Sequence, residues 1–238
     1  MQLAEVPLLE ARRLERRFGV SPILRGLDFT LQRGDVLLVV GENGTGKTTL
    51  LRLLAGLLRP TAGQVLFQGT PLQSSDPAGR RFTGLLSHQS HMYDELTLRE
   101  NLVFAARLHG LENPGKLIDS AISAAGLEAR ADDRLGRLSR GMLQRAAIAR
   151  AFLHQPSLLL LDEPFTALDT ASAERVRAWL AGQAASGHGI ILVTHQPSEV
   201  WDLATHVGVL AAGRWGIFEP RPPNIADFDR RYREATRV

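Results

Sequence analysis

Three short runs of consecutive hydrophobic residues stand out along the chain, at positions 36–40, 158–161 and 190–193. Each run has the length and aliphatic content of a strand that is buried on both faces, which is typical of a parallel sheet. Amphipathic stretches with helical spacing lie between these runs, at positions 50–58, 98–108, 140–153 and 171–185. This alternation predicts an α/β domain with a parallel sheet and right-handed crossover connections.

The middle of the chain predicts a helical subdomain inserted into the sheet domain. Thr97 and Glu100 have the spacing of a capping box at a helix start, and turn-forming residues follow at Asn113, Pro114 and Gly126. No convincing strand pattern interrupts this part of the chain. We therefore expect these helices to pack together beside the sheet.

The two ends of the chain predict antiparallel structure. Short alternations in the first 35 residues are typical of antiparallel strands at one edge of a sheet, and residues 207–210 and 215–218 flank a turn as in a hairpin. A charged segment follows Pro220.

We therefore expect a single domain with three parts. The sheet-bearing core comprises residues 1–96 and 155–219, the inserted helical subdomain comprises residues 97–154, and the C-terminal tail comprises residues 220–238.

Composition narrows the classes of protein that remain open. The 238 residues are 44% hydrophobic and 22% charged, which excludes disorder as the main state. The formal net charge of +3 is too small to mark a nucleic-acid-binding protein, and the absence of cysteine excludes thiolate metal sites and cysteine nucleophiles. The apolar runs are far shorter than the roughly 20 residues that span a bilayer, and residues 1–10 lack the basic start of a signal peptide. We expect a cytosolic protein whose membrane contact is indirect.

Residues 41–48 match the phosphate-binding pattern G-x-x-x-x-G-K-[ST] between a predicted strand and a predicted helix. Glycines let successive backbone N–H groups point at phosphate oxygens, and the helix start adds its positive dipole end. Lys47 would reach the β and γ phosphates, and Thr48 would ligate Mg²⁺. Because Lys47 is one of two lysines among 28 basic residues, an incidental lysine in a glycine turn is a poor alternative. The expected nucleotide-binding residues here are Gly41, Glu42, Asn43, Gly44, Thr45, Gly46, Lys47, Thr48 and Thr49.

The hydrophobic run at 158–161 ends in two carboxylates, Asp162 and Glu163. Ligands gather at the carboxyl ends of parallel strands, so these acids should lie beside the phosphate-binding loop. Asp162 would complete the Mg²⁺ shell, and Glu163 would orient and deprotonate the water that attacks in phosphoryl transfer. A merely polar strand terminus is the structural alternative.

Residues 138–142, Leu-Ser-Arg-Gly-Met, stand at the start of a predicted helix. Ser139 would cap that helix, and with Gly141 it would offer a hydroxyl, exposed N–H groups and the helix dipole to an anion. Taken alone, this segment is most simply an ordinary helix cap. Its position between the phosphate-binding loop and Asp162 favours an anion site instead.

With these motifs in this order, the chain resembles the ATP-binding subunits of ABC transporters from Phe18 to about Arg214. The resemblance implies a P-loop NTPase core with a parallel sheet, an N-terminal antiparallel β subdomain and an inserted α-helical subdomain. It implies ATP and Mg²⁺ as cofactors, with ATP hydrolysis coupled to transmembrane transport. It also implies that Ser139 and Gly141 contact the nucleotide held by a second copy. Arg140 and Met142 depart from the commonest Leu-Ser-Gly-Gly-Gln form of this signature segment.

The resemblance assigns roles to residues that would mean little alone. Gln89 would sense Mg²⁺ and the attacking water, and would link the core to the helical subdomain. His195, otherwise a polar residue after a strand, would contact the γ-phosphate with a titratable ring. Asp169 would contact the opposite subunit, and Phe18 would stack on adenine.

Four local stretches, residues 100–102, 107–110, 162–167 and 194–197, resemble the haem-exporter ATPase of cytochrome c maturation. This implies a homodimer at the cytoplasmic face of the inner or cell membrane, partnered by integral membrane permease subunits, with hydrolysis serving haem export. The ATPase of a drug, lipid or polysaccharide exporter stays open as an alternative. A soluble ABC-type ATPase that acts on DNA or ribosomes is disfavoured, because such proteins usually carry two cassettes or a long coiled-coil insertion. No nucleic acid is therefore expected as a partner. A P-loop kinase or GTPase is disfavoured as well, because it would lack the Ser139 signature.

Overall fold

A computed structural model describes residues 6–72, 81–87 and 90–236 of the chain. Its larger sheet has six strands in the order β10-β9-β3-β8-β7-β6, of which β10 is antiparallel to β9 and the others are parallel. In that order the strands span Arg214–Pro220, His206–Ala211, Val36–Val40, Gly189–Val193, Leu158–Asp162 and Thr83–Leu86. Every residue of β3, β7 and β8 is buried, which confirms the three strands predicted from the hydrophobic runs.

A second sheet has four antiparallel strands in the order β2-β1-β4-β5. These strands span Ser21–Leu31, Leu9–Phe18, Ala62–Phe67 and Thr70–Pro71. The sequence pattern placed antiparallel strands at an edge of the parallel sheet. The structure corrects the placement at that edge, since the N-terminal strands form a sheet of their own, as the antiparallel β subdomain implied by the resemblance requires. The predicted β9–β10 hairpin supplies the antiparallel edge of the larger sheet.

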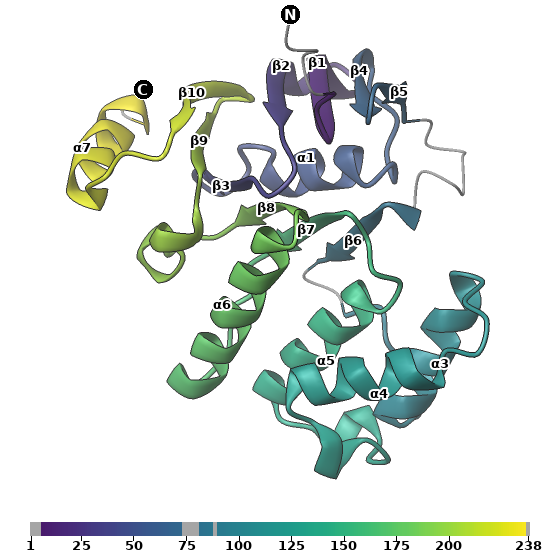
Figure 1. The fold of residues 1–238 in the computed structure, drawn as a ribbon. Coiled ribbons are helices and arrows are strands. Elements are labelled where there is room, and N and C mark those ends of the chain that lie inside the picture. Colours follow the sequence, from purple (N-terminus) through teal and green to yellow (C-terminus); the bar gives the residue numbers. More distant parts are fainter. Residues whose placement is uncertain (1–5, 73–80, 88–89, 237–238) are drawn as a thin grey trace, which may run out of the picture.

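Helix α1 (Lys47–Leu54) lies between the two sheets (Figure 1). Alternate residues of β3 face opposite sides of the larger sheet, so Leu37 and Val39 pack in the same core as the α1 leucines and the N-terminal sheet. Val36 and Leu38 pack on the other side, in a core shared with helix α6 (Thr170–Ala185). Cover on both faces explains why the sequence of these strands is uniformly apolar.

The predicted helix at 50–58 is misplaced by about one turn. Helix α1 starts directly at Lys47 because the phosphate-binding loop leads into it, and Gly56, at φ +68°, follows its end. Polar residues in the first turn of α1 concealed that start from the hydrophobic pattern.

Helices α3 (Leu98–Leu108), α4 (Gly115–Ala125) and α5 (Arg140–Phe152) pack around a hydrophobic core of their own. They extend away from the β6 side of the larger sheet (Figure 1). Thr97 and Glu100 form the predicted capping box, and Gly126 ends α4 in the left-handed conformation. Four short 3-10 helices complete the described part of the chain, at Glu128–Arg130, Leu135–Arg137, Pro197–Glu199 and Trp201–Leu203.

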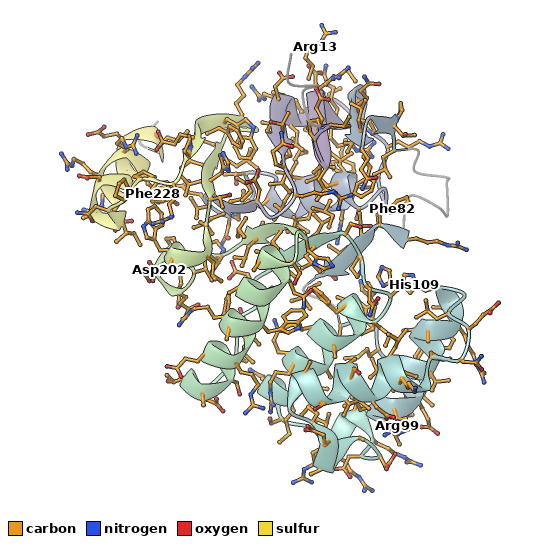
Figure 2. The ribbon with its side chains drawn as sticks, viewed as in Figure 1. Arg13, Phe82, Arg99, His109, Asp202 and Phe228 are labelled. Carbon is orange, nitrogen blue, oxygen red and sulfur yellow. The ribbon has the colours of Figure 1, made fainter. Side chains whose placement is uncertain are left out.

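The segment after Pro220 is more structured than its charge suggests. It forms helix α7 (Ile225–Thr236), whose Phe228 is 1% exposed and packs against Trp201 with ring centroids 5.1 Å apart (Figure 2). Ile225, Phe228 and Tyr232 recur at helical spacing and all join the core on the α6 side of the sheet. Charged residues on the opposite face of the helix led the sequence analysis to expect only a tail.

Candidate functional site

The strands β3, β8 and β7 are consecutive neighbours in the larger sheet, and all three run in the same direction. Their carboxyl ends therefore lie side by side. Strand β3 leads into the phosphate-binding loop, β7 ends in Asp162 and continues into Glu163, and β8 continues into Thr194 and His195. The parallel arrangement alone thus brings together residues that are more than 100 positions apart in the sequence.

The phosphate-binding loop has a conformation that requires glycine at Gly46. The φ of Gly46 is +106°, and an added Cβ would stand 2.8 Å from Leu24 Cδ2 and 3.1 Å from Ile23 Cγ2 of β2. Gly46 also caps α1 without any side-chain hydrogen bond. The first N–H groups of α1 are therefore available to an anion at the positive end of the helix.

Lys47 is 8% exposed, and its Nζ donates hydrogen bonds to the carbonyl oxygens of Gly41 and Glu42, each at 2.7 Å. Burial lowers the pKa of Lys47, and the charges of Glu163 and Asp162 oppose that effect. Phosphate oxygens would make stronger, charge-assisted bonds to this ammonium group than neutral carbonyls do.

Thr48 and Asp162 meet as the sequence predicts. Thr48 Oγ1 donates a hydrogen bond of 3.0 Å to Asp162 Oδ2, and Asp162 is 3% exposed. Both side chains present hard oxygen atoms of the kind that Mg²⁺ prefers. Within the described ranges, no group of three or more His, Asp or Glu side chains could hold a metal ion unaided. Of the described residues, Thr48 and Asp162 are the two that would hold Mg²⁺ beside the phosphates.

Glu163 is held in an unusual backbone conformation at the end of β7. Its φ is +53°, and its N–H donates to the carbonyl of Val193 in β8 at 2.9 Å. Oε1 is buried without a hydrogen bond, and His195 Nε2 lies 3.5 Å from it. Burial raises the pKa of the Glu163 carboxyl, while His195 and Thr194 act in the opposite direction. Glu163 thus presents, in the wall of the site, a carboxylate whose ionised form is disfavoured by burial, which makes it a stronger base than a solvated glutamate.

A cavity of about 370 Å³ opens at this edge of the sheet. Most of the residues that the sequence analysis selected line it, and these are Phe18, Asn43, Gly44, Gly46, Lys47, Thr48, Thr49, Asp162, Glu163 and His195. Phe18 stands at the end of β1 with 48% of its surface exposed, and the Arg16 guanidinium lies 4.5 Å from its ring centroid. One face of the ring therefore meets a cation. Ile23 of β2 also lines the cavity, and sequence analysis missed it because it carries no polar signal.

Three further residues of the phosphate-binding loop, Gly41, Glu42 and Thr45, do not line the cavity but shape the loop. Thr45 Oγ1 donates to the Glu42 carbonyl at 2.9 Å. An added Cβ on Gly41 would collide with the carbonyl oxygen of Leu210 in β9. These contacts hold the loop against the sheet.

Ser139, Gly141 and Asp169 lie outside this cavity. Ser139 Oγ accepts a hydrogen bond from the Met142 N–H at 3.3 Å and caps α5. Asp169 Oδ1 accepts from the Ser172 N–H at 2.7 Å and caps α6, which lowers the pKa of Asp169. Gln89 lies outside the described residues. A single copy of the chain thus joins the two strand-end acids and His195 to the phosphate-binding loop, but not the signature segment.

Gln144 is a link that the sequence analysis did not assign a role. From α5 its Nε2 donates hydrogen bonds of 3.1 Å to the carbonyl oxygens of both Glu163 and Pro164. An added Cβ on Gly141 would stand 2.8 Å from the Ala167 carbonyl oxygen, so the start of α5 packs directly on the same loop. Only the fold reveals this connection, because a glutamine in a helix gives no sequence signal of its own.

Comparison with known proteins agrees with this architecture. A family model described as ABC transporter matches residues 24–166, and the chain therefore belongs to the ABC transporter family. It is 42% identical, over 80% of this chain and 90% of the relative, to the cytochrome c biogenesis ATP-binding export protein CcmA 1 of Salmonella paratyphi A. It is 40% identical, over 84% and 97% respectively, to a CcmA 2 protein of the same description from Cupriavidus metallidurans. A solved ATP-binding subunit of an ABC transporter superposes with a TM-score of 0.87 at 28% identity, covering 96% of this chain and 99% of that one. The resemblance drawn from the motifs and the fold class are thereby confirmed.

The burial of Glu163 makes the stability of the protein depend on pH. A raised pKa means that the folded state disfavours the ionised carboxylate, which lowers the free energy of unfolding. This loss of stability is complete above the pKa of the folded state and absent below the pKa of the unfolded state. We therefore expect Glu163→Gln to raise the free energy of unfolding at pH 7. This gain should vanish as the pH falls below about 4, where the unfolded glutamate is also protonated. Urea denaturation at the two pH values measures it.

Glu95→Gln is the matched control, since Glu95 is exposed. It should change the free energy of unfolding by less than about 0.5 kcal/mol at either pH. An equal gain from Glu163→Gln at both pH values would show that its carboxylate carries no burial penalty.

Proposed function

We propose that this chain is the ATP-hydrolysing subunit of an ABC transporter that exports haem for cytochrome c maturation. The assignment of ATP hydrolysis rests on one observation: Lys47, Thr48, Asp162 and Glu163 all line one cavity. The cargo rests on the similarity to the CcmA export proteins. No helix among the residues that the structure describes has both the length and the apolar character needed to cross a bilayer. Transport would then take place in separate membrane subunits, with this chain at their cytoplasmic face.

In the proposed mechanism, the phosphate-binding loop and the start of α1 bind the β and γ phosphates through N–H groups, and Lys47 neutralises their charge. Thr48 and Asp162 would hold Mg²⁺, which would supply positive charge against the charge that develops on the phosphates. Glu163 orients the attacking water and takes its proton, and His195 stands beside it to contact the γ-phosphate. Phe18 offers an aromatic face to the adenine.

Two copies of the chain would complete two such sites. Ser139, Gly141 and Asp169 lie outside the cavity of their own chain, which supports a head-to-tail dimer in which the signature segment of one copy faces the nucleotide of the other. The nucleotide contacts both copies only when they close, so nucleotide binding favours the closed dimer. Hydrolysis removes these contacts and lets the dimer open.

Removing the proposed base should separate binding from turnover. In Glu163→Gln the amide cannot accept the proton of water, so we expect the ATPase rate to fall by roughly 10²-fold or more. The affinity for ATP should stay within about twofold, since the loop, Lys47 and Thr48 are untouched. Phosphate release and equilibrium nucleotide binding measure the two quantities.

Glu199→Gln serves as the control, because Glu199 stands in the 3-10 helix after His195 and does not line the cavity. It should turn over ATP at the wild-type rate. Normal phosphate release by Glu163→Gln would contradict the assigned role.

Mixing two inactive variants tests the shared site. Lys47→Ala and Ser139→Arg should each abolish hydrolysis, because each change is present in both sites of a homodimer. In a mixed dimer, the site that contains the Lys47→Ala loop faces the Ser139→Arg signature segment, so both defects fall in one site and the other site is intact. Random pairing should then restore roughly a quarter of the wild-type rate, as expected for a two-fold symmetric assembly. Full activity of a monomer, or no recovery on mixing, would contradict the dimer.

The helical subdomain offers a surface for the membrane subunits. Tyr93 and Phe104 are 51% and 40% exposed, and their rings pack edge to face with centroids 5.3 Å apart. Leu108, one helical turn beyond Phe104, is 73% exposed. A contiguous exposed patch of large apolar residues marks an interaction site, and these residues suit a cytoplasmic helix of a permease subunit.

We expect haem to raise the ATPase rate of the complex purified with its membrane subunits. Phe104→Ser should remove this stimulation, because the apolar contact that transmits it is lost, while the basal rate of the isolated subunit is kept. Leu57→Ser is the control, since Leu57 is 50% exposed and follows α1, outside the helical subdomain. Absence of stimulation in an intact complex would argue for a different exported cargo. It would not affect the assignment of ATP hydrolysis, which the Glu163→Gln and mixing experiments test.

A further inference from the structure

A second cavity, of about 390 Å³, lies between the helical subdomain and the core and takes no part in the mechanism above. Its volume is within the range of small-molecule sites. Helices α4, α5 and α6 form its walls. The apolar residues that line it include Leu117 and Ala121 of α4, Ile148 and Phe152 of α5, and Val176 and Trp179 of α6. Phe152 and Trp179 pack edge to face across α5 and α6, with ring centroids 3.9 Å apart.

Two arginines meet at the margin of this cavity. Nη1 atoms of both Arg145 and Arg175 lie within 3.2 Å of the point where a Cβ on Gly126 would stand. Arg145 Nη1 donates to the carbonyls of Ala125 and Gly126 at the end of α4, but its Nε is buried without a partner. Two like charges at one point repel each other, and an unpartnered buried donor is costly.

Neither arginine forms an ion pair within the part of the chain that the structure describes. Hydrogen bonds lower the pKa of Asp169 and Glu128, with smaller contributions from Arg145 and Arg175 at Asp169 and from Arg175 at Glu128, and both acids are exposed. Asp169 is engaged by the Ser172 N–H, and Glu128 accepts from the Ser123 hydroxyl at 2.8 Å. The guanidinium groups thus have capacity for one further anion.

We propose that this cavity binds an amphiphilic organic anion, with its apolar body against Phe152 and Trp179 and its acidic head group on Arg145 and Arg175. Ser120, Gln155, Gln183 and His188 add polar groups to the lining, but the aromatic and aliphatic walls give a ligand with an apolar body a contact surface that a free phosphate could not use. The site is independent of the ATPase assignment. Its position matters nonetheless, because α5 begins at the signature segment and α6 begins at Asp169, so a ligand would fix these two helices against each other.

Anilinonaphthalene sulfonate is a suitable probe, because it combines an aromatic body with one anionic group and fluoresces when buried. We expect saturable binding to one site per full-length chain. Arg175→Gln should weaken binding about tenfold through the loss of a charge-assisted hydrogen bond. Ala121→Phe should abolish binding, because the added ring would project into the cavity where the aromatic body of the probe must lie. The uncharged analogue phenylnaphthylamine should bind the wild-type protein about tenfold more weakly than the sulfonate does.

Two matched controls carry the same changes elsewhere. Arg107→Gln removes an exposed arginine of α3, and Ala129→Phe adds a ring at an exposed position beyond α4. Both should bind the probe as the wild type does. Energy transfer gives a second measurement that does not depend on the packing of Ala121→Phe: probe emission excited through tryptophan should fall by more than half in Trp179→Phe, since Trp179 alone among the three tryptophans lines the cavity.

Equal affinity of Arg175→Gln and wild type would overturn the proposal, because the head group would then not use the arginines. Binding that survives Ala121→Phe in a folded protein, or emission that is unchanged in Trp179→Phe, would also overturn it by placing the probe elsewhere.

Discussion

The burial of the parallel sheet on both faces is the constraint on which this molecule depends. Strands β3, β7 and β8 are covered by α1 and the N-terminal sheet on one side and by α5, α6 and α7 on the other. Such strands can expose polar groups only where they end. The phosphate-binding loop, Thr48, Asp162 and Glu163 are therefore concentrated at one edge, on a rigid base that keeps their spacing.

The same constraint gives Glu163 its chemistry. Its backbone N–H is tied to Val193 of the neighbouring strand, so the side chain stays at the margin of the apolar core. Partial burial weakens the ionised form and raises the pKa, while His195 beside it moderates that effect. A carboxylate with one unpartnered oxygen in such a place is a better proton acceptor than one in water.

Helix α5 of the helical subdomain contacts the loop at this site directly. Gln144 holds the carbonyls of Glu163 and Pro164, while Gly141 allows α5 to approach the Ala167 carbonyl. The exposed aromatic pair on the same subdomain lies on the surface proposed for the membrane subunits. Movement at that surface would pass from α3 to α5, and through Gln144 to the loop at Glu163. The cavity between α5 and α6 lies beside the second of these helices.

The amino-acid sequence by itself determined the buried strands, the phosphate-binding loop and the paired acids Asp162 and Glu163, because each depends on local pattern or on spacing within a few residues. Family resemblance added His195, Phe18 and the signature segment, of which the structure places the first two in the cavity and Ser139 outside it. Only the tertiary structure decided the rest. The docking of α7 by Phe228, the Gln144 link and the paired arginines all join residues that are distant in the chain. Such contacts follow from how whole elements pack, and no local sequence pattern records them.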